Sequence, residues 1–257
     1  MAAKELIAGI LAYPKAHRVI VERKLWPWIA VPGVMSLVYL VLLTTLGMMF
    51  FPEITTHINE NWVPGFLSGS ATYYMVSILL WLFLMVIGYL SYQQVVLICF
   101  SPVLGYLSEV VESSVYGLAS PAFSLQEAVK DILRGIAINL RNLGWMLLFT
   151  LLAWLTVLIP VFGTLVSPLL ILLIQSYYSG FGLVDYTLER KRFSVSQSIA
   201  FLHQNKARVT GVGMGFILML LIPVVGWFFA PGYGTVAATL SALEKMHGQD
   251  AEGSHGR

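Results

Sequence analysis

Residues 159–163 read Ile-Pro-Val-Phe-Gly, and the same motif returns at residues 222–226 as Ile-Pro-Val-Val-Gly. A second proline follows each copy, in Ser-Pro after the first and in Ala-Pro after the second. Proline lacks a backbone N–H and breaks a helix, whereas glycine tolerates a sharp turn. Each motif is therefore expected to bend an apolar segment back on itself. The predicted hairpin-turn residues are Pro160, Gly163, Pro168, Pro223, Gly226 and Pro231.

The composition around these motifs is that of a polytopic helical membrane protein. Of the 257 residues, 58% are hydrophobic and only 11% are charged, and the mean hydropathy is +0.79. A soluble domain has about 25% charged residues. A spanning helix needs about 20 apolar residues, so any of the long charge-free stretches can hold one span or a hairpin. These stretches are 25–52, 61–108, 142–184 and 209–243.

The lengths of the apolar segments predict an all-α integral membrane protein with two long transmembrane helices and two broken, half-penetrating helical hairpins. The long helices are expected at 25–51 and at about 71–100, with a loop from residue 52 between them. The arm 209–222 of the second hairpin is only about 21 Å long, too short to cross a core of ~30 Å comfortably. For the first hairpin, with arms at 142–159 and 164–187, two full spans are the alternative.

The segments outside the spans are predicted to form amphipathic cytoplasmic helices. Apolar residues at helical spacing mark them at 103–116, 124–140 and 194–206. Residues 1–243 then form a single membrane domain, and the polar residues 244–257 form a disordered tail.

Basic residues predict the orientation of the chain. They cluster at residues 4–24 and are then absent until Lys130, while the loop at 53–60 carries only Glu53 and Glu60 as charged residues. The positive-inside bias therefore predicts that the N- and C-termini are cytoplasmic.

Ionisable residues beside the apolar segments are candidates for function, because charge at membrane depth is costly. Arg141 and Arg208 open the two hairpins, and the alternative is that both reach the lipid headgroups. Asp185 either pairs with a basic residue of the connector 188–208 or carries a proton. The glycines in Gly-x-Gly-x-Gly at 211–215 are expected to allow close helix packing.

The sequence contains none of the usual catalytic patterns. The histidines lack metal-ligand spacing, and no Walker loop or Gly-x-Ser-x-Gly motif occurs. We therefore expect no enzyme activity, metal site, cofactor or nucleic-acid partner. Arg23, Lys24 and Arg18 are the best anion-binding candidates, because they precede the first span, where the helix dipole and guanidinium donors favour an oxyanion. The alternative is that they set the topology and contact lipid headgroups.

Three segments resemble a known family. Residues 101–109 (Ser-Pro-Val-Leu-Gly-Tyr-Leu-Ser-Glu) resemble the Pro-x-x-Gly-x-x-x-Glu opening of the third helix in the CysZ-like family, which shares a domain with eukaryotic etoposide-induced membrane proteins. Residues 185–194 resemble its Asp-Tyr-Pro…Arg…Phe segment, with Thr187 in place of proline. The motif at 222–226, with Pro231, is similar to the terminal hairpin of that family.

The resemblance implies a bacterial inner-membrane sulfate permease that imports sulfate for cysteine biosynthesis without ATP hydrolysis. Sulfate or a related oxyanion, membrane lipids and a second copy of the chain are the implied partners. The family's proposed sulfate site is a Gly-led arginine pair, whose nearest counterpart here is Arg23 and Lys24, with Glu22 in place of glycine. The alternative function is a non-transporting membrane scaffold or assembly factor that docks partners on its amphipathic helices.

Overall fold

The described part of the chain is helical throughout. This computed structural model describes residues 2–67, 69–117, 125–159 and 162–254, and no strand occurs among them. The α-helices are α1 (Ala2–Ile10), α2 (Ala12–Glu22), α3 (Trp26–Asn61), α4 (Ser70–Cys99), α5 (Ser101–Tyr116), α6 (Leu125–Leu155), α7 (Phe162–Arg190), α8 (Val195–Gln204), α9 (Lys206–Leu220) and α10 (Val225–Ser254). Short 3-10 helices occupy Gly65–Leu67 and Thr156–Leu158.

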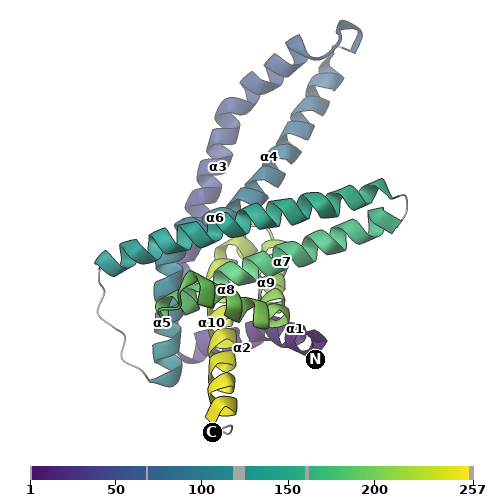
Figure 1. Cartoon of the computed structure of the whole chain (residues 1–257). Helices are drawn as coiled ribbons and strands as arrows, with labels where there is room; N and C mark the ends of the chain where they lie inside the picture. The colour runs from purple at the N-terminus through teal and green to yellow at the C-terminus, as the bar shows by residue number, and fades with distance from the viewer. Residues whose placement is uncertain (1, 68, 118–124, 160–161, 255–257) are drawn as a thin grey trace.

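Helices α3 and α4 form a long hairpin that projects from the rest of the molecule (Figure 1). The 36 residues of α3 extend over about 54 Å, well beyond a hydrocarbon core of ~30 Å. The predicted loop from residue 52 is wrong, because α3 continues through Pro52 to Asn61. No further helix breaker follows Pro52 until Pro64 and Gly65, so the helix ends just before them.

Both repeated motifs lie where one helix ends and the next begins. A Cβ on Gly163 would lie 1.7 Å from the carbonyl oxygen of Thr156, and a Cβ on Gly226 would lie 1.8 Å from that of Met219. The N–H of each glycine donates over 2.9 Å to the isoleucine that opens its motif. Gly163 and Gly226 therefore make the same close approach to a backbone carbonyl, and only glycine fits at either position. Pro223 lies in the second turn, whereas Pro160 is outside the described residues.

The first hairpin is longer than the second. Helix α6 joins the predicted amphipathic helix at 124–140 to the predicted arm at 142–159 without a break over its described residues. Among the residues that the structure describes, three helical segments are long and apolar enough to cross a membrane, namely α3, residues 134–158 and α7. The 15 residues of α9 cover only about 22 Å. How deeply either hairpin enters the membrane stays a prediction.

Small residues let α9 pack closely on three neighbours. A Cβ on Gly213 would lie 1.7 Å from the carbonyl oxygen of Ser176 on α7, and one on Gly211 would lie 2.0 Å from that of Leu6 on α1. A Cβ on Gly215 would lie 2.2 Å from the ring of Tyr13 on α2. The predicted role of these glycines in close helix packing is confirmed.

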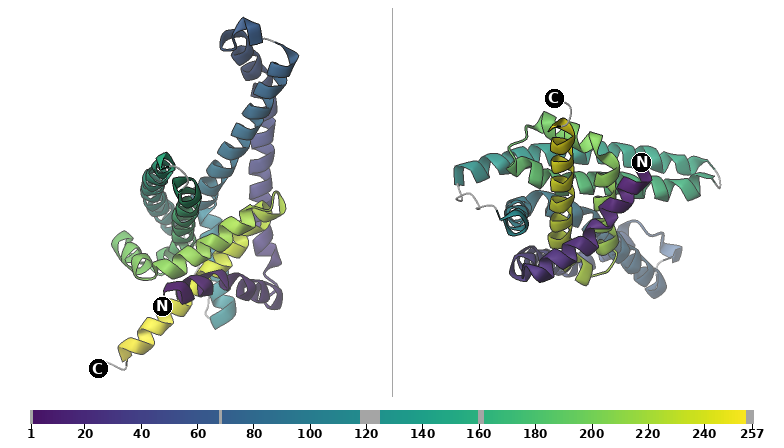
Figure 2. Two further views of the ribbon diagram at one scale, coloured as in Figure 1. Left: turned by 90° about the vertical axis from the view of Figure 1, so that its right-hand side faces the viewer. Right: turned by 90° about the horizontal axis from the view of Figure 1, so that it is seen from below.

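The helices point in different directions around this core. The hairpin α6–α7 runs across the direction of α3–α4, and α1 and α2 lie across the base of α3 (Figure 2). Helix α10 leaves the core on the same side as α1 and α2, and it continues past Leu243 to Ser254. Glu244 in this extension forms ion pairs with α2 and α9. The division of the chain into residues 1–243 and a tail stays a prediction.

Candidate functional site

A two-residue turn between α2 and α3 carries two of the cations predicted to bind an anion. Helix α2 ends at Glu22, Arg23 caps it, and Lys24 has a left-handed backbone with φ of 53°. The N–H of Leu25 closes the turn by donating over 2.9 Å to the carbonyl of Ile20. Ile20 and Leu25 are both buried, which anchors the inner side of the turn. The side chains of Arg23 and Lys24 are exposed.

Arg18 lies on α2 beside an aromatic cluster that flanks this turn. The Nδ1 atom of His17 lies 2.8 Å from the hydroxyl of Tyr233, and the two rings stack with centroids 6.0 Å apart. Trp26 packs edge-on against His17 with ring centroids 6.4 Å apart. The cluster holds α2 and the start of α3 against α10, while Arg18 is exposed.

These three cations carry no internal counter-charge in the part of the chain that the structure describes. Their side chains form no hydrogen bond or ion pair with another described residue. Arg23 and Lys24 are adjacent in the turn, but no contact joins Arg18 to them. Their positive charges are therefore open to a soluble anion or a lipid headgroup.

The basic residues deeper in the fold are instead paired with carboxylates. Arg134 on α6 donates to both carboxylate oxygens of Asp185 on α7, over 3.1 and 3.2 Å. It also lies 3.3 Å from Glu189 and donates over 2.7 Å to Ser198 on α8. The expected pairing of Asp185 with the connector is wrong, because Asp185 faces α6 across the hairpin.

The connector residues bind a different carboxylate. Arg190 and Lys191 both donate to Glu112 on α5, and the Nζ of Lys191 lies 2.5 Å from it. Burial raises the pKa of Glu112, but the hydrogen bonds from Lys191 and Arg190 outweigh it and hold that pKa below its ordinary value. Glu112 is thus a charged link between α5 and α7.

Arg208 is buried, and two carboxylates hold its side chain. Its Nε donates over 3.0 Å to Glu5 on α1, and its Nη1 donates over 3.0 Å to Glu244 on α10. Lys245 lies 2.8 Å from the same oxygen of Glu5. The hydrogen bond from Lys245, with that from Arg208, lowers the pKa of Glu5. This network fixes the N-terminal helix to the second hairpin.

A layer of three buried hydroxyls joins α5, α7 and α10, and sequence reasoning missed it. The Oγ of Ser108 lies 3.0 Å from the Oγ1 of Thr187, and Thr239 donates to Ser108 over 3.0 Å. Thr187 donates to Thr239 over 3.3 Å. The only signal in the sequence was Thr187, which stands where the resembled family has proline. The three hydroxyls of this layer satisfy one another's hydrogen-bonding groups without a charged residue.

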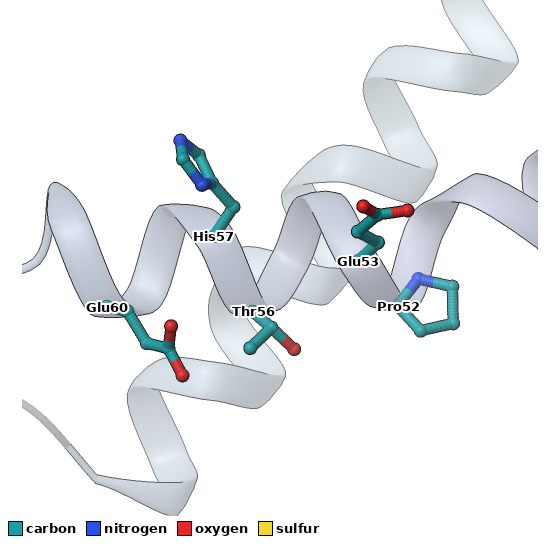
Figure 3. A pocket seen from close by; sticks show the side chains of 5 residues that line it. All are labelled: Pro52, Glu53, Thr56, His57 and Glu60. Atoms are coloured by element: carbon teal, nitrogen blue, oxygen red, sulfur yellow. The ribbon is translucent and has the colours of Figure 1, made fainter.

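A hollow lies on the last turns of α3 (Figure 3), whereas the basic turn precedes the first residue of that helix. Its lining residues are Pro52, Glu53, Thr56, His57 and Glu60. His57 and Glu60 point to different sides of the helix (Figure 3), so their side chains do not converge on one ligand. No group of three or more potential metal ligands occurs among the described residues. The two carboxylates make this end unfavourable for an anion.

Comparison with known proteins decides the family. The family model for "Sulfate transporter CysZ/Etoposide-induced protein 2.4" matches residues 12–231, from α2 into α10. The chain belongs to this family. The predicted resemblance is confirmed, and the match includes the basic turn and both hairpin turns.

Several curated members of this family are similar to the chain over much of its length. A sulfate transporter CysZ from Vibrio cholerae is 30% identical over 213 residues, which cover 78% of this chain and 82% of that protein. One from Pseudomonas fluorescens is 31% identical over 153 residues, or 59% and 61% of the two chains. One from Pseudomonas syringae pv. tomato is 28% identical over 204 residues, or 77% and 79%. Because its described residues include helices long and apolar enough to span a membrane, this member of a transporter family is a membrane protein.

Proposed function

We propose that the chain is a sulfate or oxyanion permease of the bacterial inner membrane, which imports sulfate for cysteine biosynthesis without hydrolysing ATP. Membership of a family whose curated relatives are named sulfate transporters carries this proposal. The exposed cations at the α2–α3 turn support it, because they are free of internal counter-charge within the described part of the chain.

Arg23, Lys24 and Arg18 form the first anion-binding site in this proposal. A guanidinium group offers a planar set of donors that suits an oxyanion, and Lys24 adds a second positive charge beside the start of α3. All three side chains are exposed, so they bind a hydrated anion weakly. Weak binding is what permeation requires, because the anion must also leave.

The path beyond this site is proposed to pass the two broken hairpins. Hairpin α6–α7 runs across α3–α4 (Figure 1). Only one of these two hairpins can therefore lie along the membrane normal. This arrangement supports hairpins that enter the membrane only partway. Both turns expose apolar side chains, including Leu158 and Ile222, which lipid or a second copy of the chain covers in a homodimer. The positive-inside bias places both termini in the cytoplasm.

Flux of labelled sulfate into liposomes that contain the purified protein tests the proposal. We expect saturable flux that excess selenate inhibits, measured with and without an imposed proton gradient. The matched controls are empty liposomes and a variant in which Arg18, Arg23 and Lys24 are all changed to Gln. Wild-type flux equal to that of empty liposomes, from protein shown to be folded and inserted, would reject the permease.

That outcome would favour the scaffold alternative. A scaffold or assembly factor is expected to copurify with a partner in stoichiometric yield and to leave growth on limiting sulfate unchanged when it is deleted. A permease is expected to restore growth of a sulfate-uptake mutant on limiting sulfate. A scaffold is not expected to restore that growth, so the two functions give opposite results in the sulfate-uptake mutant.

A further inference from the structure

Arg141 stands apart from the other arginines at the feet of the hairpins. Arg134, Arg190 and Arg208 each contact a carboxylate. The polar contact that the structure shows for Arg141 is a hydrogen bond of 3.4 Å from its Nη1 to the neutral amide oxygen of Asn142. Arg141 is exposed, and no carboxylate among the described residues pairs with it.

Two tyrosines of α7 lie within electrostatic range of the charge of Arg141, namely Tyr177 and Tyr178. The helix register agrees with this placement. Arg134 pairs with Asp185 across the first hairpin, and Arg141 and Tyr178 each lie seven residues from that pair, about two helical turns along antiparallel helices.

The ring of His203 on α8 contacts one of these two tyrosines. It packs edge-on against Tyr177 with ring centroids 6.2 Å apart. Tyr177 in turn packs against Tyr178 with centroids 5.2 Å apart. Helix α8 begins with a capping box at Ser194 and Gln197, so its position, and that of His203, is well defined.

A buried donor without a partner lies next to Arg141. Asn142 is 4% exposed, and its Nδ2 atom has no hydrogen-bond partner among the described residues. Buried polar groups are nearly always hydrogen-bonded, so an unpaired amide donor calls for a bound ion, water or ligand. The carboxylates that lie nearest along α7, Asp185 and Glu189, are already held by Arg134. The guanidinium of Arg141, which bonds to the Oδ1 of the same amide, thus puts a positive charge beside an amide whose Nδ2 donor is unpaired.

We propose that the guanidinium of Arg141, the amide of Asn142 and the two neighbouring phenols form a second oxyanion site at the foot of the first hairpin. Its ligand is a tetrahedral oxyanion, either sulfate or the phosphate of a lipid headgroup. The sulfate form of this site rests on the proposed permease function. A sulfate ion would then bind a second time at a site on α6 and α7, which is separate from the site at the turn between α2 and α3.

The test compares the sulfate KM of liposome flux for the wild type, Arg141→Gln and Asn142→Ala. We expect KM to rise about tenfold in Arg141→Gln, as the loss of one charge-assisted hydrogen bond would produce, and less in Asn142→Ala. Arg141→Lys keeps the charge and is expected to fall between Arg141→Gln and the wild type. The matched control is Lys206→Gln, an exposed lysine at the foot of the second hairpin, which is expected to leave KM unchanged.

A second experiment distinguishes a sulfate site from a lipid-phosphate site. Native mass spectrometry of the same variants, purified with phosphatidylglycerol or with phosphatidylcholine alone, reports retained lipid. Selective loss of phosphatidylglycerol from Arg141→Gln identifies a lipid-phosphate site, whereas a raised KM without lipid loss identifies a sulfate site. Unchanged KM together with unchanged lipid retention would overturn the proposal. Absence of flux in the wild type would instead reject the permease, and the lipid experiment would then decide the site alone.

Discussion

The hydroxyl of Tyr92 donates over 2.5 Å to the carbonyl oxygen of Trp227. In a regular helix that carbonyl would accept from the N–H of residue 231, but Pro231 has no N–H to donate. The ring of Tyr92 also stacks on Trp227, with centroids 4.6 Å apart and planes at 17°. Tyr92 is fully buried on α4 and shares a second hydrogen bond of 2.9 Å with Ser36 on α3. The long hairpin thus compensates for the proline in the second broken hairpin.

Tyr92→Phe should therefore destabilise the protein while it keeps the ring stacking. The variant leaves the buried carbonyl of Trp227 unpaired, which costs about 1–3 kcal/mol. We expect a lower apparent Tm in detergent, measured by size-exclusion chromatography after heating. Tyr74→Phe, on the exposed side of the same helix, is the control and should melt like the wild type. Equal melting of both variants would mean that the hydrogen bond contributes little.

The two turn glycines should not tolerate alanine. In Gly163→Ala and Gly226→Ala the new methyl group would lie within 2 Å of a backbone carbonyl oxygen, so the turn must open. We expect each variant to lose about 3 kcal/mol of stability or more and to show reduced yield of monodisperse protein.

Gly144→Ala is the matched control, because nothing lies within 4 Å of its Cβ position inside α6. Alanine is the better helix former by up to about 1 kcal/mol, so this variant should be as stable as the wild type or more so. If the turn variants match it, the tight turns do not exist in the membrane.

Glu112 should make stability depend on pH on the acid side. The pKa of Glu112 is lower in the folded protein than in the unfolded chain. Its stabilisation of the folded state is therefore fully present above the unfolded pKa of about 4.3, and it is lost as the pH falls through the lower folded pKa. Glu112→Gln should flatten that acid loss. It should also lower the stability at pH 7 by about 3 kcal/mol, because Arg190 and Lys191 lose their carboxylate.

Unfolding midpoints measured from pH 7 down to about 3 check this prediction. Glu53→Gln, an exposed carboxylate on α3, serves as the control and should keep the wild-type stability at pH 7. An acid loss of the same size in Glu112→Gln and in the wild type would contradict the assigned role.

Local chemistry explains what the sequence could predict. The motifs at 159–163 and 222–226 located both helix breaks, because proline and glycine act on the backbone where they stand. The glycines at 211–215 likewise indicated close packing, which the contacts of Gly213 with Ser176 confirm. Pro52 misled the prediction of a loop, since a single proline in a long helix kinks it without ending it.

The register between helices explains what could not be predicted. Asp185 was assigned to the connector, but its partner Arg134 is 51 residues away in sequence and is brought close by the packing of α6 on α7. The same register brings Arg141 near Tyr177, and the docking of α8 packs His203 against that tyrosine. In contrast, the exposure of Arg23 and Lys24 follows from their place just before an apolar helix. Their role in anion binding stays a prediction.

Neutralising that turn should weaken sulfate uptake without loosening the fold. The side chains of Arg18, Arg23 and Lys24 are exposed and form no contact with another described residue that folding depends on. Arg23→Gln combined with Lys24→Gln should therefore keep the wild-type Tm and raise the sulfate KM of liposome flux by about tenfold or more. The rise should shrink at high ionic strength, because salt screens exposed charges. Lys4→Gln removes an exposed charge from α1 and should change neither quantity. A KM unaffected by the double substitution, in protein that transports sulfate, would move the first binding step away from this turn.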